Sequence, residues 1–118
     1  IVALAGHAQE PKDFTVAPVG AINKVLEKAG WSIADVDLFE VNEAFACVAM
    51  FAMHDLGIDH AKINVNGGAT ALGHPIGASG TRIVTTLIAA LKKHGLKKGV
   101  ASLCIGGGEA TALAVEIL

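Results

Sequence analysis

Short apolar runs alternate with stripes of apolar residues at helical spacing in the first part of the chain. Residues 1–5 are apolar and predict a buried strand, and the polar residues 9–15, which include a proline, predict a loop. A helix is predicted next, because Pro18 suits a first helical turn and Gly30 is typical of a helix end. The apolar stripe of this helix consists of Ile22, Val25, Leu26 and Ala29.

The middle of the chain predicts two further strands around a second helix. Residues 36–41 favour a strand and end in the polar pair Asn42 and Glu43. From there to Leu56 the residues are apolar on almost every face, which predicts a helix buried all round, with Asn42 as the cap of its first turn. Residues 63–65 predict another short strand.

The last part of the chain predicts a third helix followed by a hairpin. The helix begins at Gly80 and ends at Gly95, with basic residues in its last turn, where the helix dipole favours them. Residues 100–105 and 111–118 predict two strands, and the connection through residues 106–109 is short enough to require a hairpin. The apolar stripe of the helix consists of Ile83, Val84, Leu87, Ile88 and Leu91.

These elements follow the order strand, helix, strand, helix, strand, helix, strand, strand. This alternation predicts an α/β fold in which helices cover a mixed, mostly parallel, five-stranded sheet whose last strand runs antiparallel. The 118 residues have room for one core, and no linker or internal repeat divides them. We therefore expect a single domain over residues 1–118.

The composition argues against several classes of protein. Nine Lys and Arg against eleven Asp and Glu give a net charge of −2, and no basic run is interleaved with aromatic residues, so nucleic-acid binding is not expected. No apolar run approaches the ~18 residues of a membrane span, and no charged segment precedes an apolar run at the start, so neither a membrane span nor an export signal is expected in this segment. Cys47 and Cys104 favour free thiols in the cytoplasm or an organelle matrix. Because the chain opens on Ile1 inside an apolar run, we expect it to be part of a longer protein.

Two glycine clusters mark candidate sites. Eight of the fourteen glycines fall in residues 67–80 and 106–108, which indicates a local need for backbone freedom. In the first cluster His74 stands between Gly73 and Pro75, where a constrained backbone presents the ring and small neighbours leave room beside it. A phosphate-binding loop is not expected, because the Gly-Lys-Ser/Thr pattern and the dinucleotide glycine spacing are both absent.

In the second cluster Cys104 comes just before three consecutive glycines. A cysteine at a strand end is usually a small apolar residue, but the glycines expose backbone N–H groups that can form an oxyanion hole. A third motif, residues 42–45, predicts by itself only a helix cap followed by a buried phenylalanine. The cysteines and histidines lack the spacing of a zinc site, so no metal is expected.

Taken together, the three motifs resemble the thiolase family, and most closely its members that use acetyl-CoA. The matching segments are Asn42-Glu43-Ala44-Phe45, the glycine loop with Gly73-His74-Pro75, and Cys104 with residues 106–108, in family order across the whole chain. The resemblance implies a layered thiolase fold and the C-terminal domain of a longer parent. It also implies acyl transfer between coenzyme A thioesters, by Claisen condensation or by thiolysis of a 3-ketoacyl-CoA, with no further cofactor.

The resemblance implies a role for each matched residue. His74 matches the histidine that takes a proton from a nucleophilic cysteine and donates to a thioester oxygen, and Asn42 matches the asparagine that holds a water beside it. Cys104 matches the cysteine that removes the α-proton of the second acetyl-CoA. Gly106 matches the glycine whose N–H contributes to a second oxyanion site. The residues that match positions beside the pantetheine tunnel are Ala44 and Phe45.

The family's nucleophilic cysteine has no counterpart in this chain, since it belongs to the N-terminal half, and Cys47 in the expected buried helix is not a substitute. The resemblance therefore implies a chain that is inactive alone and that joins an N-terminal half, as a dimer or tetramer, to act on acyl-CoA. Two alternatives stay open. One is a cysteine hydrolase with Cys104 as nucleophile and His74 as base, and the other is a non-catalytic half-domain that serves folding and dimer packing.

Overall fold

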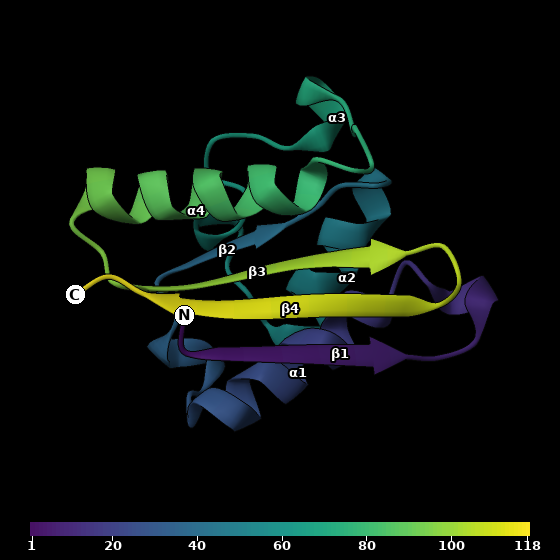
Figure 1. The fold of residues 1–118 in the computed structure, drawn as a ribbon, viewed down its shortest axis with the longest axis horizontal. Helices are drawn as coiled ribbons and strands as arrows, with labels where there is room; N and C mark the ends of the chain where they lie inside the picture. The colour runs from purple at the N-terminus through teal and green to yellow at the C-terminus, as the bar shows by residue number, and fades with distance from the viewer.

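The computed structural model describes all 118 residues and shows a four-stranded sheet with helices on both faces (Figure 1). The strands are β1 (Ala3–Ala8), β2 (Leu38–Val41), β3 (Lys98–Ile105) and β4 (Glu109–Glu116), and their order in the sheet is β1-β4-β3-β2. The helices are α1 (Ala17–Ala29), α2 (Ala46–Leu56), α3 (Ala69–Leu72) and α4 (Ser79–His94). Short 3-10 turns occur at Pro11–Asp13, Ile33–Asp35 and His60–Lys62.

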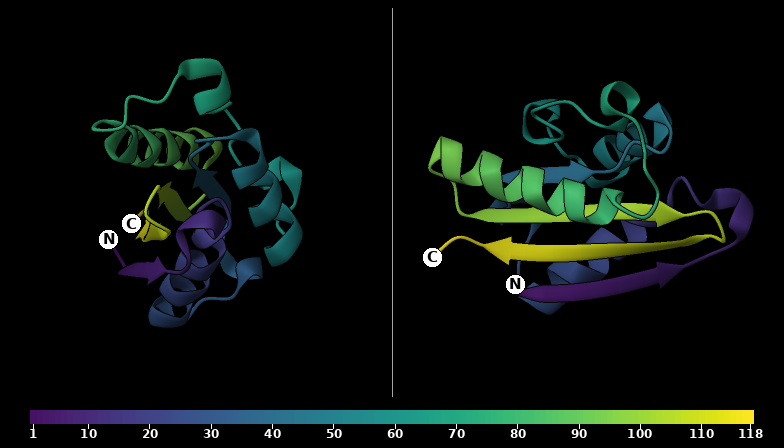
Figure 2. Two further views of the ribbon diagram at one scale, coloured as in Figure 1. Left: turned by 90° about the vertical axis from the view of Figure 1, so that its right-hand side faces the viewer. Right: turned by 45° about the horizontal axis from the view of Figure 1, so that its top comes forward.

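The sheet separates two apolar cores. Helices α1 and α4 lie on opposite faces of the sheet, and α2 packs beside α1 and β2 (Figure 2). Because side chains alternate along a strand, Val100 and Cys104 of β3 face the larger core of 19 residues under α1 and α2, whereas Ala101 faces the smaller core of 7 residues under α4. None of the helices is long and apolar enough to cross a membrane.

The directions of the strands agree with the predicted reversal of the last strand. Strand β4 is antiparallel to both of its neighbours, β1 and β3, whereas β2 and β3 are parallel. Three strands therefore run one way and β4 runs the other. The expectation of a mixed sheet with an antiparallel last strand is confirmed. The expectation that the sheet is mostly parallel is wrong, because β4 lies between β1 and β3 and only the pair of β2 and β3 is parallel.

The prediction of a fifth strand at residues 63–65 is wrong. Ile63 forms only an isolated parallel bridge with Phe39, because the chain turns at Asn64, whose φ is 48°. The Asn64 side chain then pairs with the end of β2: its Oδ1 accepts from the Val41 N–H at 2.9 Å and its Nδ2 donates to the Val41 carbonyl at 2.8 Å. A side-chain amide thus takes the hydrogen bonds that a longer fifth strand would have made.

The predicted ends of the first and third helices are confirmed. Gly30 and Gly95 follow α1 and α4 in the left-handed conformation, with φ of 68° and 67°, which glycine adopts without strain. The hairpin between β3 and β4 is also confirmed, and Gly108 has a φ of 100°. A Cβ at Gly108 would collide with the carbonyl oxygen of Gln9, so glycine is required where the hairpin meets the segment after β1.

Two expectations for the second helix are wrong. Helix α2 begins only at Ala46, so Asn42 is not its cap; the Asn42 N–H instead donates to the Ser102 carbonyl at 2.9 Å, which extends the pairing of β2 with β3. The helix is not buried all round either. Phe45 and Met50 are each 60% exposed, because nothing in the chain covers the side of α2 that faces away from the sheet. The buried residues of α2 are Val48, Ala49 and Ala52.

Candidate functional site

The sequence motifs meet at one edge of the sheet. Strands β2 and β3 are parallel, so their carboxyl ends lie at the same edge, and α4 begins beside it (Figure 1). Asn42 follows β2 directly, Cys104 is the second-last residue of β3, and His74 lies in the loop that leads into α4. Ligands of open α/β sheets bind at this kind of edge.

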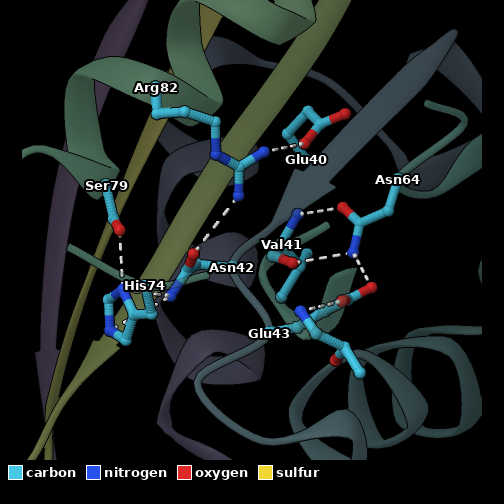
Figure 3. A network of polar contacts seen from close by, with 9 residues as sticks. Glu40, Val41, Asn42, Glu43, Asn64, His74, Ser79 and Arg82 are labelled. Carbon is cyan, nitrogen blue, oxygen red and sulfur yellow. Dashed lines mark hydrogen bonds and ion pairs between the residues drawn. The ribbon is translucent and has the colours of Figure 1, made fainter. Parts of the chain in front are cut away.

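The structure brings Asn42 and His74 into contact (Figure 3). The Asn42 Nδ2 lies 3.4 Å from both ring nitrogens of His74, and the His74 Nδ1 lies 2.6 Å from the Ser79 Oγ. On its other side, the Asn42 Oδ1 accepts from Arg82 Nη2 at 3.4 Å. Because a guanidinium only donates, Arg82 fixes the Asn42 amide with its oxygen towards Arg82 and its N–H₂ group towards the imidazole.

The loop that carries His74 is closed by its own backbone. Gly73 has a φ of 89°, which turns the chain just before the histidine. The Pro75 carbonyl then accepts from the Ala78 and Ser79 N–H groups at 2.8 and 2.9 Å, which leads the chain into α4. The half-buried His74 ring is therefore held between a glycine turn and the start of a helix.

A carboxylate holds the preceding loop against β2. The Glu43 carboxylate accepts from the Thr70 N–H at 3.0 Å and from the Asn64 Nδ2 at 3.1 Å. Burial raises the pKa of Glu43, but the hydrogen bonds from Thr70 and Asn64 outweigh it, so the net pKa lies below its usual range. A side chain at Gly68 would collide with this carboxylate, so the second glycine of the loop allows the two segments to approach.

Behind Asn42 lies a buried acid. Glu40 of β2 is 1% exposed, its Oε2 is 3.4 Å from Arg82 Nη1, and its Oε1 has no hydrogen-bond partner. Burial raises its pKa to about 7, against the opposing effect of Arg82. The Arg82 guanidinium thus contacts both the buried Glu40 carboxylate and the Asn42 amide of the site.

Cys104 lies one residue before the end of β3, near this edge of the sheet, but it makes no hydrogen bond with His74. No hydrogen bond connects the two side chains, and the Cys104 thiol belongs to the core under α1 and α2. Burial raises the pKa of Cys104, which favours the neutral thiol. After it, Gly106 is exposed and its N–H makes no hydrogen bond within the chain, so this donor is open to a ligand.

The two residues predicted beside a pantetheine tunnel lie in the turn that joins β2 to α2. The Ala44 N–H donates to the Asn42 carbonyl at 3.0 Å, which places Phe45 at the start of α2. The Phe45 and Phe14 rings pack edge to face, with their centroids 6.0 Å apart, while most of the Phe45 side chain is exposed. The prediction that this phenylalanine is buried is therefore wrong.

Three residues of this network were missed in the sequence. Glu40 is a carboxylate inside an apolar strand, and Arg82 interrupts the apolar pattern of α4, so both carried a signal of buried polarity. Ser79 carried a weaker one, as a small polar residue at the start of a helix. No group of three or more His, Cys, Asp or Glu residues in the structure could hold a metal ion.

Comparison with known proteins decides the family. A family model described as "Thiolase, C-terminal domain" matches residues 1–117. The chain belongs to the thiolase family. This thiolase domain is 54% identical to the acetyl-CoA acetyltransferase of Allochromatium vinosum and 50% identical to the cytosolic acetyl-CoA acetyltransferase of Mus musculus, in each case over 98% of the chain.

Solved structures agree with the assignment of the fold. The crystal structure of the Bacillus anthracis acetyl-CoA acetyltransferase superimposes on the whole chain with a TM-score of 0.97 and 48% identity. Human mitochondrial 3-ketoacyl-CoA thiolase gives the same TM-score at 45% identity. The thiolase domain described here spans about 30% of the length of these relatives. The resemblance in the motifs and the α/β fold are thereby confirmed.

Proposed function

We propose that this chain carries the acid/base and oxyanion-binding residues of an acetyl-CoA acetyltransferase, which transfers acetyl groups between coenzyme A thioesters. The observation that carries the proposal is the contact between Asn42 and the ring of His74, at 3.4 Å, at the sheet edge where β3 ends, one residue after Cys104. Membership of the thiolase family and the names of the relatives support the class of reaction.

The first task of the site is to stabilise a charged oxygen. Removing the α-proton of acetyl-CoA places negative charge on the thioester oxygen, and donors that are already oriented stabilise that charge best. We assign the His74 Nε2–H and the Asn42 amide, acting directly or through a water, as these donors. Arg82 supports this role because it keeps the N–H₂ group of Asn42 on the side of His74.

The second task is proton transfer, which we assign to Cys104. In condensation a Cys104 thiolate takes the α-proton, and the enolate carbon attacks an acetyl group carried by a cysteine outside this chain, whose thiolate leaves. In thiolysis the steps reverse, and the Cys104 thiol returns the proton to the departing acetyl carbanion. Because burial raises its pKa, the thiol form that donates this proton predominates in the chain.

Gly106, Ala44 and Phe45 are proposed to bind other parts of the substrate. The free N–H of Gly106 is suited to donate a hydrogen bond to the oxygen of a second carbonyl, since an exposed backbone donor needs no reorganisation. The exposed Phe45 ring offers apolar contact area to a pantetheine chain, and the neighbouring Ala44 leaves space for it. The coenzyme A thioester is the substrate, and the proposed reaction needs no separate cofactor.

We infer that the N-terminal half of the parent protein covers the open part of the sheet. A hollow of about 170 Å³ lies between α4 and the exposed side of β4, and Leu4 at its rim is 62% exposed. Apolar residues form most of its lining, which suits a partner rather than water. The same interaction would place a nucleophilic cysteine near His74. We also infer a dimer or tetramer, in the cytoplasm or an organelle matrix, from the family resemblance and the two free cysteines.

Activity in an assembled protein tests the proposal. In a fusion protein, residues 1–118 replace the matching C-terminal segment of one of the acetyltransferase relatives. We expect this fusion to cleave acetoacetyl-CoA with added coenzyme A, and the isolated 118-residue chain to be inactive, because the acylated cysteine is outside it. A soluble, folded fusion without thiolase activity would contradict the proposed function.

A further inference from the structure

We propose that Ser79 is a positioning residue for His74: its hydroxyl pairs with Nδ1 in both neutral tautomers of the ring, so that Nε2 alone exchanges protons with the substrate. This inference rests on the proposed acetyl transfer. It concerns the behaviour of His74 within that reaction, and Ser79 itself touches neither substrate nor reacting atoms.

The first support is the fixed placement of the hydroxyl. Ser79 is 1% exposed, its N–H donates to the Pro75 carbonyl at 2.9 Å, and its Oγ lies 2.6 Å from the His74 Nδ1. The Ser79 end of this hydrogen bond is therefore shielded from water. The ring can therefore turn away from Ser79 only by leaving a buried hydroxyl without its short partner, which costs stability.

The second support is that the Ser79 hydroxyl does not cap the helix. A serine at the start of a helix commonly caps it by accepting from a free backbone N–H, but α4 has no side-chain cap and begins one residue after Ala78. The only other partner of the Ser79 Oγ is the Pro75 carbonyl at 3.2 Å. The Ser79 hydroxyl is thus shared between the ring nitrogen, a contact that Figure 3 shows, and the Pro75 carbonyl.

With these two partners, the Ser79 hydroxyl can form hydrogen bonds with either neutral tautomer of the ring. When Nδ1 carries the proton, it donates to the Ser79 Oγ, and the hydroxyl proton turns to the Pro75 carbonyl. When Nε2 carries the proton, the hydroxyl donates to Nδ1 instead, because a hydroxyl both donates and accepts. In the first state Nε2 has a free lone pair for the proton of a thiol. In the second state Nε2–H can donate to a thioester oxygen.

The protons balance in each transfer at Nε2. If Nε2 takes a proton from a thiol, the thiol becomes a thiolate and His74 an imidazolium, whose Nδ1–H still donates to the Ser79 Oγ. Returning that proton from Nε2 to a leaving carbanion or thiolate restores the neutral ring. The ring stays in place throughout, because Nδ1 keeps its proton and its hydrogen bond to the Ser79 Oγ, while the hydroxyl proton stays directed at the Pro75 carbonyl.

Kinetics of the fusion protein provide one part of the test, with a matched control in the chain itself. Ser102 is also a fully buried serine, but its hydroxyl donates to the Thr111 carbonyl at 2.8 Å and not to His74. We expect Ser79→Ala to lower kcat for thiolysis by about 10- to 100-fold, the usual effect of removing the partner that orients a functional histidine, with KM changed less than about threefold. Ser79→Thr, which keeps a hydroxyl, is expected to retain more of kcat than Ser79→Ala.

Equal kcat values for Ser79→Ala and Ser102→Ala would overturn the inference. A wild-type fusion without activity would contradict the proposed function instead. The role of Ser79 would then be tested by NMR spectra of the 118-residue chain, labelled with ¹⁵N in its histidines. At acidic pH the Nδ1–H of His74 is expected to exchange slowly with water and Nε2–H rapidly. Rapid exchange at both nitrogens of the wild-type ring would overturn the role of Ser79, whether or not the variants fold.

Discussion

Replacing Cys104 with alanine in the fusion protein is expected to lower kcat for thiolysis of acetoacetyl-CoA by about 10²- to 10⁴-fold, the range that general acid/base catalysis contributes. The reason is that the departing acetyl carbanion would lose its proton donor, while binding of the substrate elsewhere is unchanged. Cys104 is buried, and alanine fills most of its space, so the fold should persist. Steady-state kinetics and circular dichroism check both statements.

The second cysteine provides the matched control. Cys47 lies in the first turn of α2, is only half-buried, and takes no part in the network around His74. Cys47→Ala should therefore leave kcat within about twofold of the wild type, because surface-directed substitutions of this kind are usually mild. Full activity in Cys104→Ala, or an equal loss in both variants, would show that Cys104 is not the proton donor.

Replacing Arg82 with methionine is expected to lower the free energy of unfolding at pH 8 by about 3–5 kcal/mol, the usual cost of removing one partner from a buried ion pair. Arg82 is the cation that faces the buried carboxylate of Glu40, and its loss leaves that charge without compensation. Urea unfolding of the chain measures the effect. The exposed pair between Lys12 and Glu10 is the control, and Lys12→Met should change stability by less than about 0.5 kcal/mol.

The direction of the pH dependence follows from the pKa of Glu40. In the folded chain this pKa is raised from 4.5 to about 7, so the folded state holds the proton more tightly than the unfolded state. The stability that Glu40 contributes is fully present below about pH 4.5 and is lost as the pH rises through 7. The loss from Arg82→Met should accordingly be smaller at pH 5 than at pH 8, and Glu40→Gln should recover most of it. A loss that does not change between these pH values would contradict the account.

The sequence predicted the fold best where a single segment decides the structure. The apolar stripes of α1 and α4, with Gly30 and Gly95 after them, identify both helices because periodicity and a helix end agree. The prediction of a fifth strand was wrong because the Asn64 side chain forms hydrogen bonds with the backbone N–H and carbonyl of Val41 at the end of β2. This contact joins residues 23 positions apart, and no local pattern announces it.

The sequence identified candidate residues of the site but not the contacts between them. The motifs led to Asn42 and His74, and the structure brings these two together. Their supports, Ser79 and Arg82, act through contacts that depend on how α4 packs on β2, which local periodicity does not reveal. No hydrogen bond joins Cys104 to His74 in this chain, so their joint action stays a prediction. Under the proposed function, the N-terminal half of the parent protein would complete that site.

The position of the acetyl group most directly tests the claim that this chain supplies the acid/base part of a thiolase site and not its nucleophile. The wild-type fusion is mixed with acetyl-CoA, quenched with acid, digested and analysed by mass spectrometry. The account predicts an acetyl group on a cysteine of the N-terminal segment and an unmodified peptide containing Cys104. An acetyl group on Cys104, in the fusion or in the isolated chain, would contradict it and would favour the cysteine hydrolase instead.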